Sequence, residues 1–238
     1  MRYDITLRIN YRYNTPAGAA RMHLRMLPLT SSRQRLLSGL VSVDPAPDHR
    51  RDRTDFFGNA VTELAFDSAV DALDFRFSGR VLREDLETEL DLSCPLATLA
   101  TEIRQINALG ANAPHHFLGA SERVRPVPEI AAFARDAIGA QMSALAAVQA
   151  VSSALHETFE FDPTATDVTT DPAEAFAQKR GVCQDISHVM ICALRAIGVP
   201  AGYVSGYLRT DPPEGQPRLE GADAMHAWVR AWCGHDMG

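Results

Sequence analysis

Through its first eighty or so residues, the chain alternates between apolar and polar positions with the two-residue period of β-strands. In YDITLRINYRYN, which starts at Tyr3, the apolar and aromatic residues fall on one face and the polar residues on the other. Turn signals such as Pro16-Ala17-Gly18 separate this run from later ones of the same kind: RMHLRML, RLLSGLVSV, FFGNAVTELAF and LDFRFSGRV. Several short strands with turns between them predict an antiparallel β-sandwich over residues 1–85, without catalytic groups.

From about residue 95 the pattern changes to the 3.6-residue period of helices. Helices are predicted at 99–109, 128–138 and 143–159, followed by a short helix that Asp171 opens and that stops at Gly181. A further helix is predicted from Cys183 to Gly198, with a continuous apolar stripe. Strands are predicted at 201–208 and 224–232, with an exposed loop over 209–223 between them. The change of period divides the chain into residues 1–85 and 86–238.

Composition narrows the class of protein. Of the 238 residues, 46% are hydrophobic and 22% charged, which is typical of a globular protein. The net charge is −7, and Asp52 interrupts the one Arg-rich patch at 49–53, so we expect no nucleic-acid partner. No apolar run is long enough to cross a bilayer, and the N-terminal residues lack the apolar segment of a secretory signal. We therefore expect a cytoplasmic protein without a membrane partner.

The four cysteines are scattered along the chain without a CxxC pair, so neither disulfides nor a structural zinc site are predicted. No cluster of residues has metal-ligand spacing, and no cofactor is predicted. Cys183 stands out because it opens a predicted helix. A helix N-terminus carries a partial positive charge and unpaired N–H groups, so a thiol there loses its proton more easily and becomes a nucleophile. The alternative is that Cys183 is a small apolar core residue.

A reactive cysteine needs a base, and the chain offers eight histidines. Seven are set aside: His188 points around the circumference of the cysteine helix, and the others fall in the sandwich, in a loop, in an earlier helix or at the end of the chain. His226 lies in a strand predicted to run beside 201–208, against which the cysteine helix can pack. There an imidazole can take the thiol proton and later give it to a leaving amine. The separation of 43 positions from Cys183 is compatible with such a pair and does not prove it.

At these residues the chain resembles a known family. RGVCQDISHVMICALRAIGVPAGYVSGYL followed by HAWVRAW is similar to the core of the transglutaminase-like superfamily, with its G-x-C-x-D, G-[IV]-P-A, V-x-G-Y and H-A-W patterns. The first eighty residues, including HLRMLPLTSSRQ, DPAP and DFFGNAV, resemble the N-terminal region that bacterial members carry.

The resemblance implies an α+β fold in which the sandwich is followed by a papain-like core. It makes Cys183 the nucleophile and His226 its base, lying within a few ångströms of each other. The implied reaction is acyl transfer or hydrolysis at peptide or glutamine-type amides through a thioester, so the implied partner is a protein or peptide substrate. The N–H of Cys183 is expected to stabilise the oxyanion. Hydrolysis and transamidation remain open.

One departure from the family pattern concerns its third catalytic residue, an aspartate on the strand after the histidine strand. The chain ends in CGHDMG, and Asp236 is read as a turn residue, so we expect a core that is incomplete at its C-terminus and an impaired triad. The strand at 224–232 is then expected to expose an edge through which copies of the chain self-associate. A catalytically silent peptide-binding or scaffolding module is the alternative function.

Plainer roles are expected for the remaining residues of interest. Asp185 is predicted to stabilise the start of its helix. The tryptophans of the last predicted strand, Trp228 and Trp232, are predicted to lie in the core. Cys192 is expected to be inert packing, and Cys94 is expected to have no role.

Overall fold

The structure is a computed structural model that describes residues 1–84, 90–209 and 225–234. Its strands and helices confirm the predicted change of character along the chain. The elements are β1 (Arg2–Ala17), β2 (Arg21–Leu24), β3 (Gln34–Asp44), β4 (His49–Thr54), β5 (Ala60–Ala65), β6 (Val70–Arg83), α1 (Leu96–Gln105), η1 (Pro114–Phe117, a 3₁₀ helix), α2 (Pro128–Ala137), α3 (Ala144–Thr158), β7 (Glu160–Phe161), α4 (Pro172–Gln178), β8 (Arg180–Gly181), α5 (Cys183–Ala196), β9 (Ala201–Tyr207) and β10 (Met225–Ala231).

The chain forms two compact units, Met1–Glu89 and Leu90–Gly238. The predicted boundary between residues 85 and 86 lies outside the described residues.

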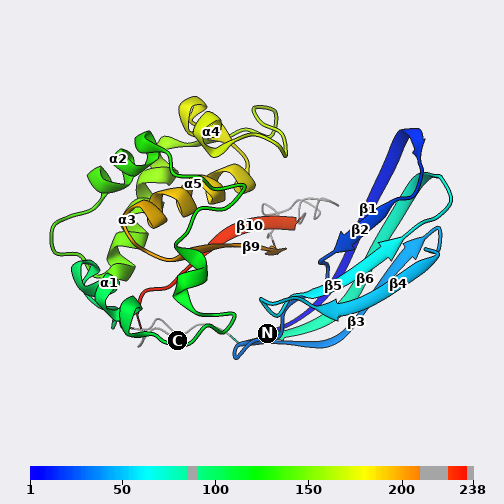
Figure 1. The fold of residues 1–238 in the computed structure, drawn as a ribbon, viewed down its shortest axis with the longest axis horizontal. Coiled ribbons are helices and arrows are strands. Elements are labelled where there is room, and N and C mark those ends of the chain that lie inside the picture. Colours follow the sequence, from blue (N-terminus) through cyan, green and yellow to red (C-terminus); the bar gives the residue numbers. More distant parts are fainter. Residues whose placement is uncertain (85–89, 210–224, 235–238) are drawn as a thin grey trace, which may run out of the picture. The chain divides into compact units, whose positions relative to one another are not determined.

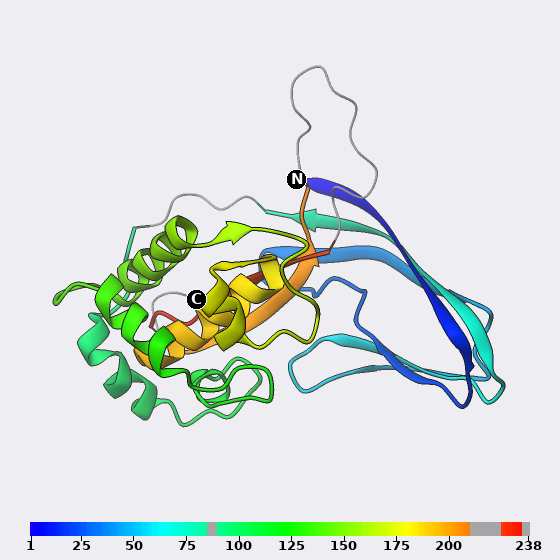
Figure 2. The ribbon, with the colours of Figure 1, turned by 90° about the horizontal axis from the view of Figure 1, so that it is seen from above.

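The first unit is the predicted β-sandwich. One antiparallel sheet has the strand order β1-β6-β3 and the other β2-β5-β4 (Figures 1 and 2). Alternating residues of β6 enter the core between the sheets, because Leu73, Phe75 and Phe77 are fully buried as predicted. Val61 and Leu64 of β5 are buried as well.

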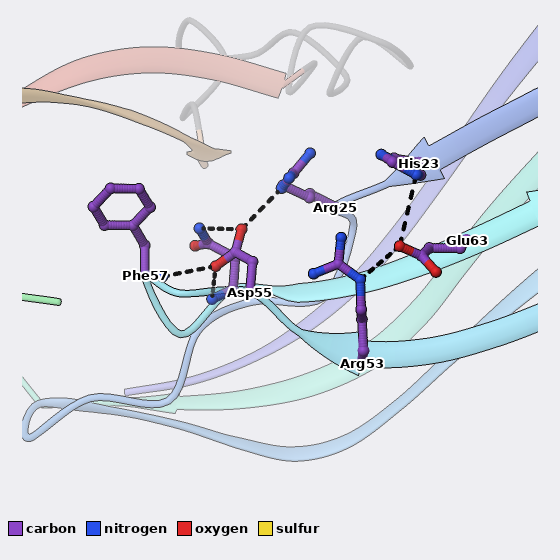
Figure 3. A network of polar contacts seen from close by, with 7 residues as sticks. His23, Arg25, Arg53, Asp55, Phe57 and Glu63 are labelled. Atoms are coloured by element: carbon purple, nitrogen blue, oxygen red, sulfur yellow. Dashed lines mark hydrogen bonds and ion pairs between the residues drawn. The ribbon is translucent and has the colours of Figure 1, made fainter.

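A carboxylate closes the turn that joins β4 to β5 (Figure 3). Asp55 accepts hydrogen bonds from the N–H groups of Phe57 and Asn59, at 3.0 and 2.9 Å, and from the Arg25 Nε at 3.2 Å. Such a side-chain-to-backbone turn fixes the loop without help from the core. Glu63 of β5 forms an ion pair with Arg53 of β4, which is a second polar interaction between strands of this sheet (Figure 3).

An ion cluster around the buried side chain of Asp74 joins two strands of the first sheet. Arg8 of β1 lies directly opposite Arg76 of β6, a like-charged pair that would repel by itself. Asp74 separates them, accepting from Arg8 Nε at 2.8 Å and from Arg76 Nη2 at 2.9 Å, with its side chain only 9% exposed. The Arg8 and Arg76 guanidinium groups lower the pKa of Asp74 to about 2.

This cluster predicts a pH-dependent contribution to stability. A carboxyl whose pKa falls on folding stabilises the folded state above its unfolded pKa, and the contribution disappears as the pH falls toward the folded pKa. Asp74→Asn should therefore lower the thermal midpoint at pH 5 to 7. The difference from the wild type should shrink between about pH 4 and pH 2, where the wild-type carboxyl also becomes protonated.

The control for Asp74→Asn is Asp4→Asn in the same sheet. Asp4 pairs with Arg80 across β1 and β6, but its side chain is 68% exposed, and exposed pairs contribute little. Thermal unfolding followed by circular dichroism across this pH range measures both variants. An equal effect of the two substitutions at pH 7 would contradict the role given to Asp74.

In the second unit, α5 lies between the β9–β10 hairpin and the helices α2, α3 and α4 (Figure 1). Its buried residues include Val189, Ile191 and Leu194, which share one core with Val151 and Leu155 of α3. The predicted helices at 128–138 and 143–159 are confirmed to within one residue at each end.

The structure differs from the sequence-based prediction in two connecting segments. The helix predicted at 99–109 instead spans Leu96–Gln105, because Pro95 stands at its N-cap and Ile106 is extended. The 3₁₀ helix η1 was not predicted. Of the predicted loop at 209–223, all but Arg209 lies outside the described residues.

Among the residues that the structure describes, β10 pairs with β9 alone. Self-association through residues 224–232 stays a prediction. Each helix within the described ranges is too short or too polar to cross a membrane. The cytoplasmic location likewise stays a prediction.

Candidate functional site

Cys183 is the first residue of α5, which confirms its predicted place at the start of a mostly buried helix. Its own side chain is half-buried. The residue before it, Val182, is extended and serves as the N-cap, but its side chain has no acceptor for a first-turn N–H group. By contrast, Ser143 caps α3 and Asp171 caps α4 through hydrogen bonds to first-turn N–H groups. The N-cap side chains of α3 and α4 therefore accept from first-turn N–H groups, whereas the N-cap side chain of the cysteine helix does not.

Two contacts fix the position of the segment that precedes Cys183: strand pairing with β7 and close packing against Asp185. The short strand β8 runs parallel to β7, pairing Phe161 with Gly181. Gly181 has a φ of +155°, and a Cβ there would lie 2.7 Å from the Asp185 Oδ2. Any side chain at this position would thus clash with the carboxylate, so the glycine is required for the close approach.

The Asp185 side chain joins this segment to the first turn of α5 through hydrogen bonds. Its side chain is fully buried, and Oδ2 accepts from the Val182 N–H at 2.8 Å and from the Thr166 hydroxyl at 2.7 Å. This is one half of a capping box, in which the third helical residue reaches back to the N-cap N–H. The other oxygen, Oδ1, has no hydrogen-bond partner among the described residues. The predicted structural role of Asp185 is thus extended from helix electrostatics to a specific hydrogen bond.

The other three thiols lie in environments that favour the protonated form. Burial, followed by the Glu102 carboxylate, raises the pKa of Cys94. Burial raises the pKa of Cys192, whose thiol donates to the Arg125 carbonyl at 3.3 Å. Burial raises the pKa of Cys233 to about 11. Cys192 packs in the core, as expected.

The topology brings His226 to the same end of the unit as Cys183. Helix α5 is about 21 Å long, and the seven residues of β9 return along it for about 23 Å. β10 then runs antiparallel to β9, and His226 pairs with Gly206, the last residue but one of β9. At the other end, the Trp232 N–H donates to the Pro200 carbonyl at 2.9 Å, which fixes the register. His226 is therefore level with the start of α5.

Strand alternation assigns the His226 side chain to one face of β10. Val229 and Ala231 pack against the core that contains α5. His226 shares the opposite face with Trp228, whose ring lies over Gly206. No hydrogen bond joins the Cys183 thiol to the His226 imidazole in the described part of the chain. The structure thus brings the two residues to one end of the α5–β10 layer, and their direct contact stays a prediction.

The tryptophans of this segment differ in environment. Trp232 packs against the core, as expected. Trp228 is 39% exposed, so its predicted core position is wrong. It lies on the outer face of the hairpin because the inner face is taken by α5.

Two rings that were not selected as site residues from the sequence, those of Tyr203 and His188, contact each other between β9 and α5. Tyr203 of β9 faces α5, and its ring is 5.1 Å from the His188 ring, centroid to centroid, with an angle of 32° between their planes. Burial, followed by the charge of Arg123, lowers the pKa of His188. Burial, followed by the negative charges of Cys183 and Asp185, raises the pKa of Tyr203. The two-residue period of AGYVSGYL could have drawn attention to Tyr203, because it puts Tyr203 and Tyr207 on the same face of the strand.

Comparison with known proteins identifies the family. The family model of the transglutaminase-like superfamily matches residues 131–237, and that of the bacterial transglutaminase-like N-terminal region matches residues 3–82. An uncharacterized protein of Mycobacterium tuberculosis is 31% identical over 252 residues, covering 100% of this chain and 75% of the relative. The chain belongs to the transglutaminase-like superfamily.

Further relatives of this transglutaminase-like protein agree in extent and in fold. An uncharacterized protein of Mycobacterium leprae is 29% identical over 228 residues, which cover 94% of this chain and 77% of the relative. The crystal structure of a candidate cysteine protease from Cytophaga hutchinsonii matches with a TM-score of 0.74 at 18% identity. That match covers 98% of this chain and 73% of the other. The predicted α+β fold, a sandwich followed by a papain-like core, is confirmed.

The hydrogen bonds of Asp185 predict a large effect on stability. Asp185→Ala leaves the Val182 N–H and the Thr166 hydroxyl without their acceptor, and each buried group left unpaired costs about 1 to 3 kcal/mol. We expect the free energy of unfolding of the transglutaminase-like protein to fall by about 2 to 4 kcal/mol in urea denaturation.

The matched control for Asp185→Ala is Gln184→Ala, next to it in the same helical turn. The Gln184 amide makes one long hydrogen bond, 3.4 Å to the Val168 carbonyl, so its loss should cost at most about 0.5 kcal/mol. Thr166→Val should fall between the two. Equal losses for Asp185→Ala and Gln184→Ala would contradict the anchoring role of Asp185.

Proposed function

We propose that this chain is a cysteine-dependent acyl-transfer enzyme that acts on peptide or glutamine-type amides, with Cys183 as nucleophile and His226 as general base. The observation that carries the proposal is the position of Cys183, the half-buried first residue of a helix whose N-cap residue has no side-chain acceptor. Membership of the transglutaminase-like superfamily supports the same reaction class.

In the proposed first half-reaction, His226 takes the thiol proton and the Cys183 sulfur attacks the amide carbon. The electron pair of the carbonyl moves onto its oxygen, where the Cys183 N–H at the helix start can donate a hydrogen bond. When this intermediate collapses, the C–N bond breaks, and the amine or ammonia leaves with the proton that the imidazolium returns. A thioester on Cys183 remains.

The second half-reaction reverses the roles. Water or a second amine gives a proton to His226 and attacks the thioester carbon, the C–S bond breaks, and the thiol regains its proton. Water yields a carboxylic acid and an amine yields a new amide. Water is the simpler acceptor because a half-exposed thiol is open to solvent.

Strand alternation puts His226 on the β10 face opposite Val229, so the proposal requires the imidazole to turn toward Cys183 when substrate binds. Catalytic hydrogen bonds are often long in the free enzyme and tighten in the complex with substrate. The alternative function, a silent peptide-binding module, requires no such contact, and the following measurement separates the two.

Thiol reactivity tests the nucleophile. With iodoacetamide at pH 7, Cys183 should be alkylated at least about ten times faster than Cys94, Cys192 or Cys233, because the thiolate is the reacting form and the pKa values of the other three are raised. Peptide mass spectrometry over time gives the four rates separately. A Cys183 that reacts no faster than Cys94 would favour the binding module.

Acylation by p-nitrophenyl acetate tests the base. Release of p-nitrophenolate in one burst should accompany formation of a thioester on Cys183 and be absent in Cys183→Ala. His226→Ala should lower the burst rate at pH 7 by at least about 100-fold, the scale of general base catalysis. His156→Ala is the control, because His156 lies on α3 near its C-terminal end and should leave the rate unchanged. Equal rates for the two histidine variants would remove His226 from the mechanism.

A further inference from the structure

The segment that begins in β7 and leads to α4 lies at the end of α5 where Cys183 begins the helix (Figure 1). Its first residues are bonded to the residues before the cysteine. Phe161 of β7 pairs with Gly181 of β8, and the Asp162 N–H donates to the Gly181 carbonyl at 3.1 Å. Paired strands lie about 4.8 Å apart. The Phe161 backbone is therefore one strand spacing from a residue that precedes Cys183 by two positions.

Farther along, the same segment is bonded to the residues after the cysteine. The Thr166 hydroxyl donates to the Asp185 Oδ2 at 2.7 Å. The Gln184 Nε2 donates to the Val168 carbonyl across a longer distance, 3.4 Å. Gln184 and Asp185 are the two residues that follow Cys183 in α5. The segment is thus bonded to the chain on both sides of the proposed nucleophile, and it borders the start of α5, where a substrate must approach the thiol.

Two exposed apolar side chains belong to this segment. Phe161 is 63% exposed and Val168 is 71% exposed. Single exposed apolar residues are common on protein surfaces, but these two stand on one segment that is bonded to the residues around a nucleophile. Binding sites for organic substrates are lined mainly by apolar side chains, with a few polar groups that fix orientation. Phe161 and Val168 supply apolar area of this kind at the start of α5.

The part of the segment between these two side chains is ordered by its own polar groups. The Asp162 Oδ1 accepts from the Thr164 N–H at 2.9 Å and from the Thr164 hydroxyl at 2.7 Å. The Asp167 Oδ1 accepts from the Thr169 N–H at 2.7 Å and from the Thr169 hydroxyl at 2.6 Å. Each aspartate closes a turn by binding the backbone two residues on. A substrate therefore has little of this segment to order when it binds, which lowers the entropic cost of the contact.

We propose that Phe161 and Val168 form the subsite for an apolar side chain next to the carbonyl that Cys183 attacks. This inference rests on the proposed function and narrows its substrate to peptide amides that follow an apolar residue. The acyl group stays bonded to Cys183 in the thioester, so the side chain on its α-carbon stays beside the segment through both half-reactions. A glutamine-type amide presents only two methylene groups at this place and gains less apolar contact.

A pair of ester probes tests the subsite on the intact chain. The p-nitrophenyl esters of tert-butoxycarbonyl-glycine and tert-butoxycarbonyl-leucine acylate a thiol by the same chemistry and differ in one apolar side chain. Each burst rate is divided by the rate of the same ester with free N-acetylcysteine, which removes their intrinsic difference in reactivity. After this correction the leucine ester should acylate wild-type Cys183 at least about ten times faster, the lower end of what recognition of an apolar group achieves.

The variants are Phe161→Ser and Val168→Ser, each of which replaces an exposed apolar side chain with a small polar one. Each should lower the leucine-to-glycine ratio by at least about threefold, because part of the apolar contact is lost. The glycine ester and iodoacetamide should react with Cys183 at their wild-type rates, since neither presents an apolar side chain. Thermal unfolding of both variants shows that the fold is kept.

The matched control is Leu109→Ser, which should leave the ratio unchanged. Leu109 is 69% exposed in the same unit, and its carbonyl contacts the His116 ring nitrogen at 3.2 Å. The next residue, Phe117, covers Gly202 at the start of β9, which lies near the end of α5 remote from Cys183.

The outcomes separate this inference from the proposed function. A wild type without preference for the leucine ester, or an unchanged ratio in both Phe161→Ser and Val168→Ser, would overturn the inference and leave the proposed function standing. Rates that fall equally for both esters would also overturn it, because the segment would then act on the thiol itself. A wild-type Cys183 that neither the esters nor iodoacetamide modify faster than Cys94 would overturn the proposed function, and this inference with it.

Discussion

The hydrogen bond from the Val182 N–H to the buried Asp185 carboxylate is the constraint on which the site depends. It fixes the residue before Cys183 against the first turn of α5, and it requires a glycine at 181, because a Cβ there would meet the carboxylate at 2.7 Å. The Thr166 hydroxyl, from the loop before α4, completes the anchor. Because Asp185 binds the N–H of the N-cap residue, it leaves the Cys183 N–H for another acceptor. A Ser or Asp at the N-cap, as in α3 and α4, would instead occupy first-turn donors.

The hairpin opposite α5 is shaped by two glycines on its outer face. A Cβ at Gly202 would lie 2.8 Å from the Phe117 ring of η1, and one at Gly206 would lie 2.5 Å from the Trp228 ring. Rings therefore cover this face, whereas Tyr203 and Val229 turn toward α5 on the other. The hairpin is thus packed on both faces, and this packing fixes the positions of β9 and β10 along the axis of α5. These positions place His226 level with Cys183.

Local signals in the sequence predicted much of this arrangement, and contacts between distant residues account for what they missed. The glycine break before Cys183, the apolar stripe after it and the alternation through Phe75 and Phe77 are properties of short windows, and each was confirmed. The bond between Thr166 and Asp185 joins positions 19 apart, so no periodicity reveals it. The predicted core position of Trp228 was wrong for a similar reason. Alternation shows that Trp228 and Val229 face opposite ways, but only the packing of α5 decides which face is inside.

The environments of three thiols in the second unit raise their pKa values and so favour their protonated forms. Cys192 lies nine residues after Cys183 on the same helix, yet burial raises its pKa and its proton is donated to the Arg125 carbonyl. Cys94 and Cys233 are further disfavoured as thiolates because their charges would oppose each other and those of Glu102 and Asp91. A soft electrophile that reaches this unit therefore meets one thiol at a helix N-terminus and three thiols whose raised pKa values favour the protonated form. Selectivity of this kind follows from burial and charge alone, before any substrate contact is considered.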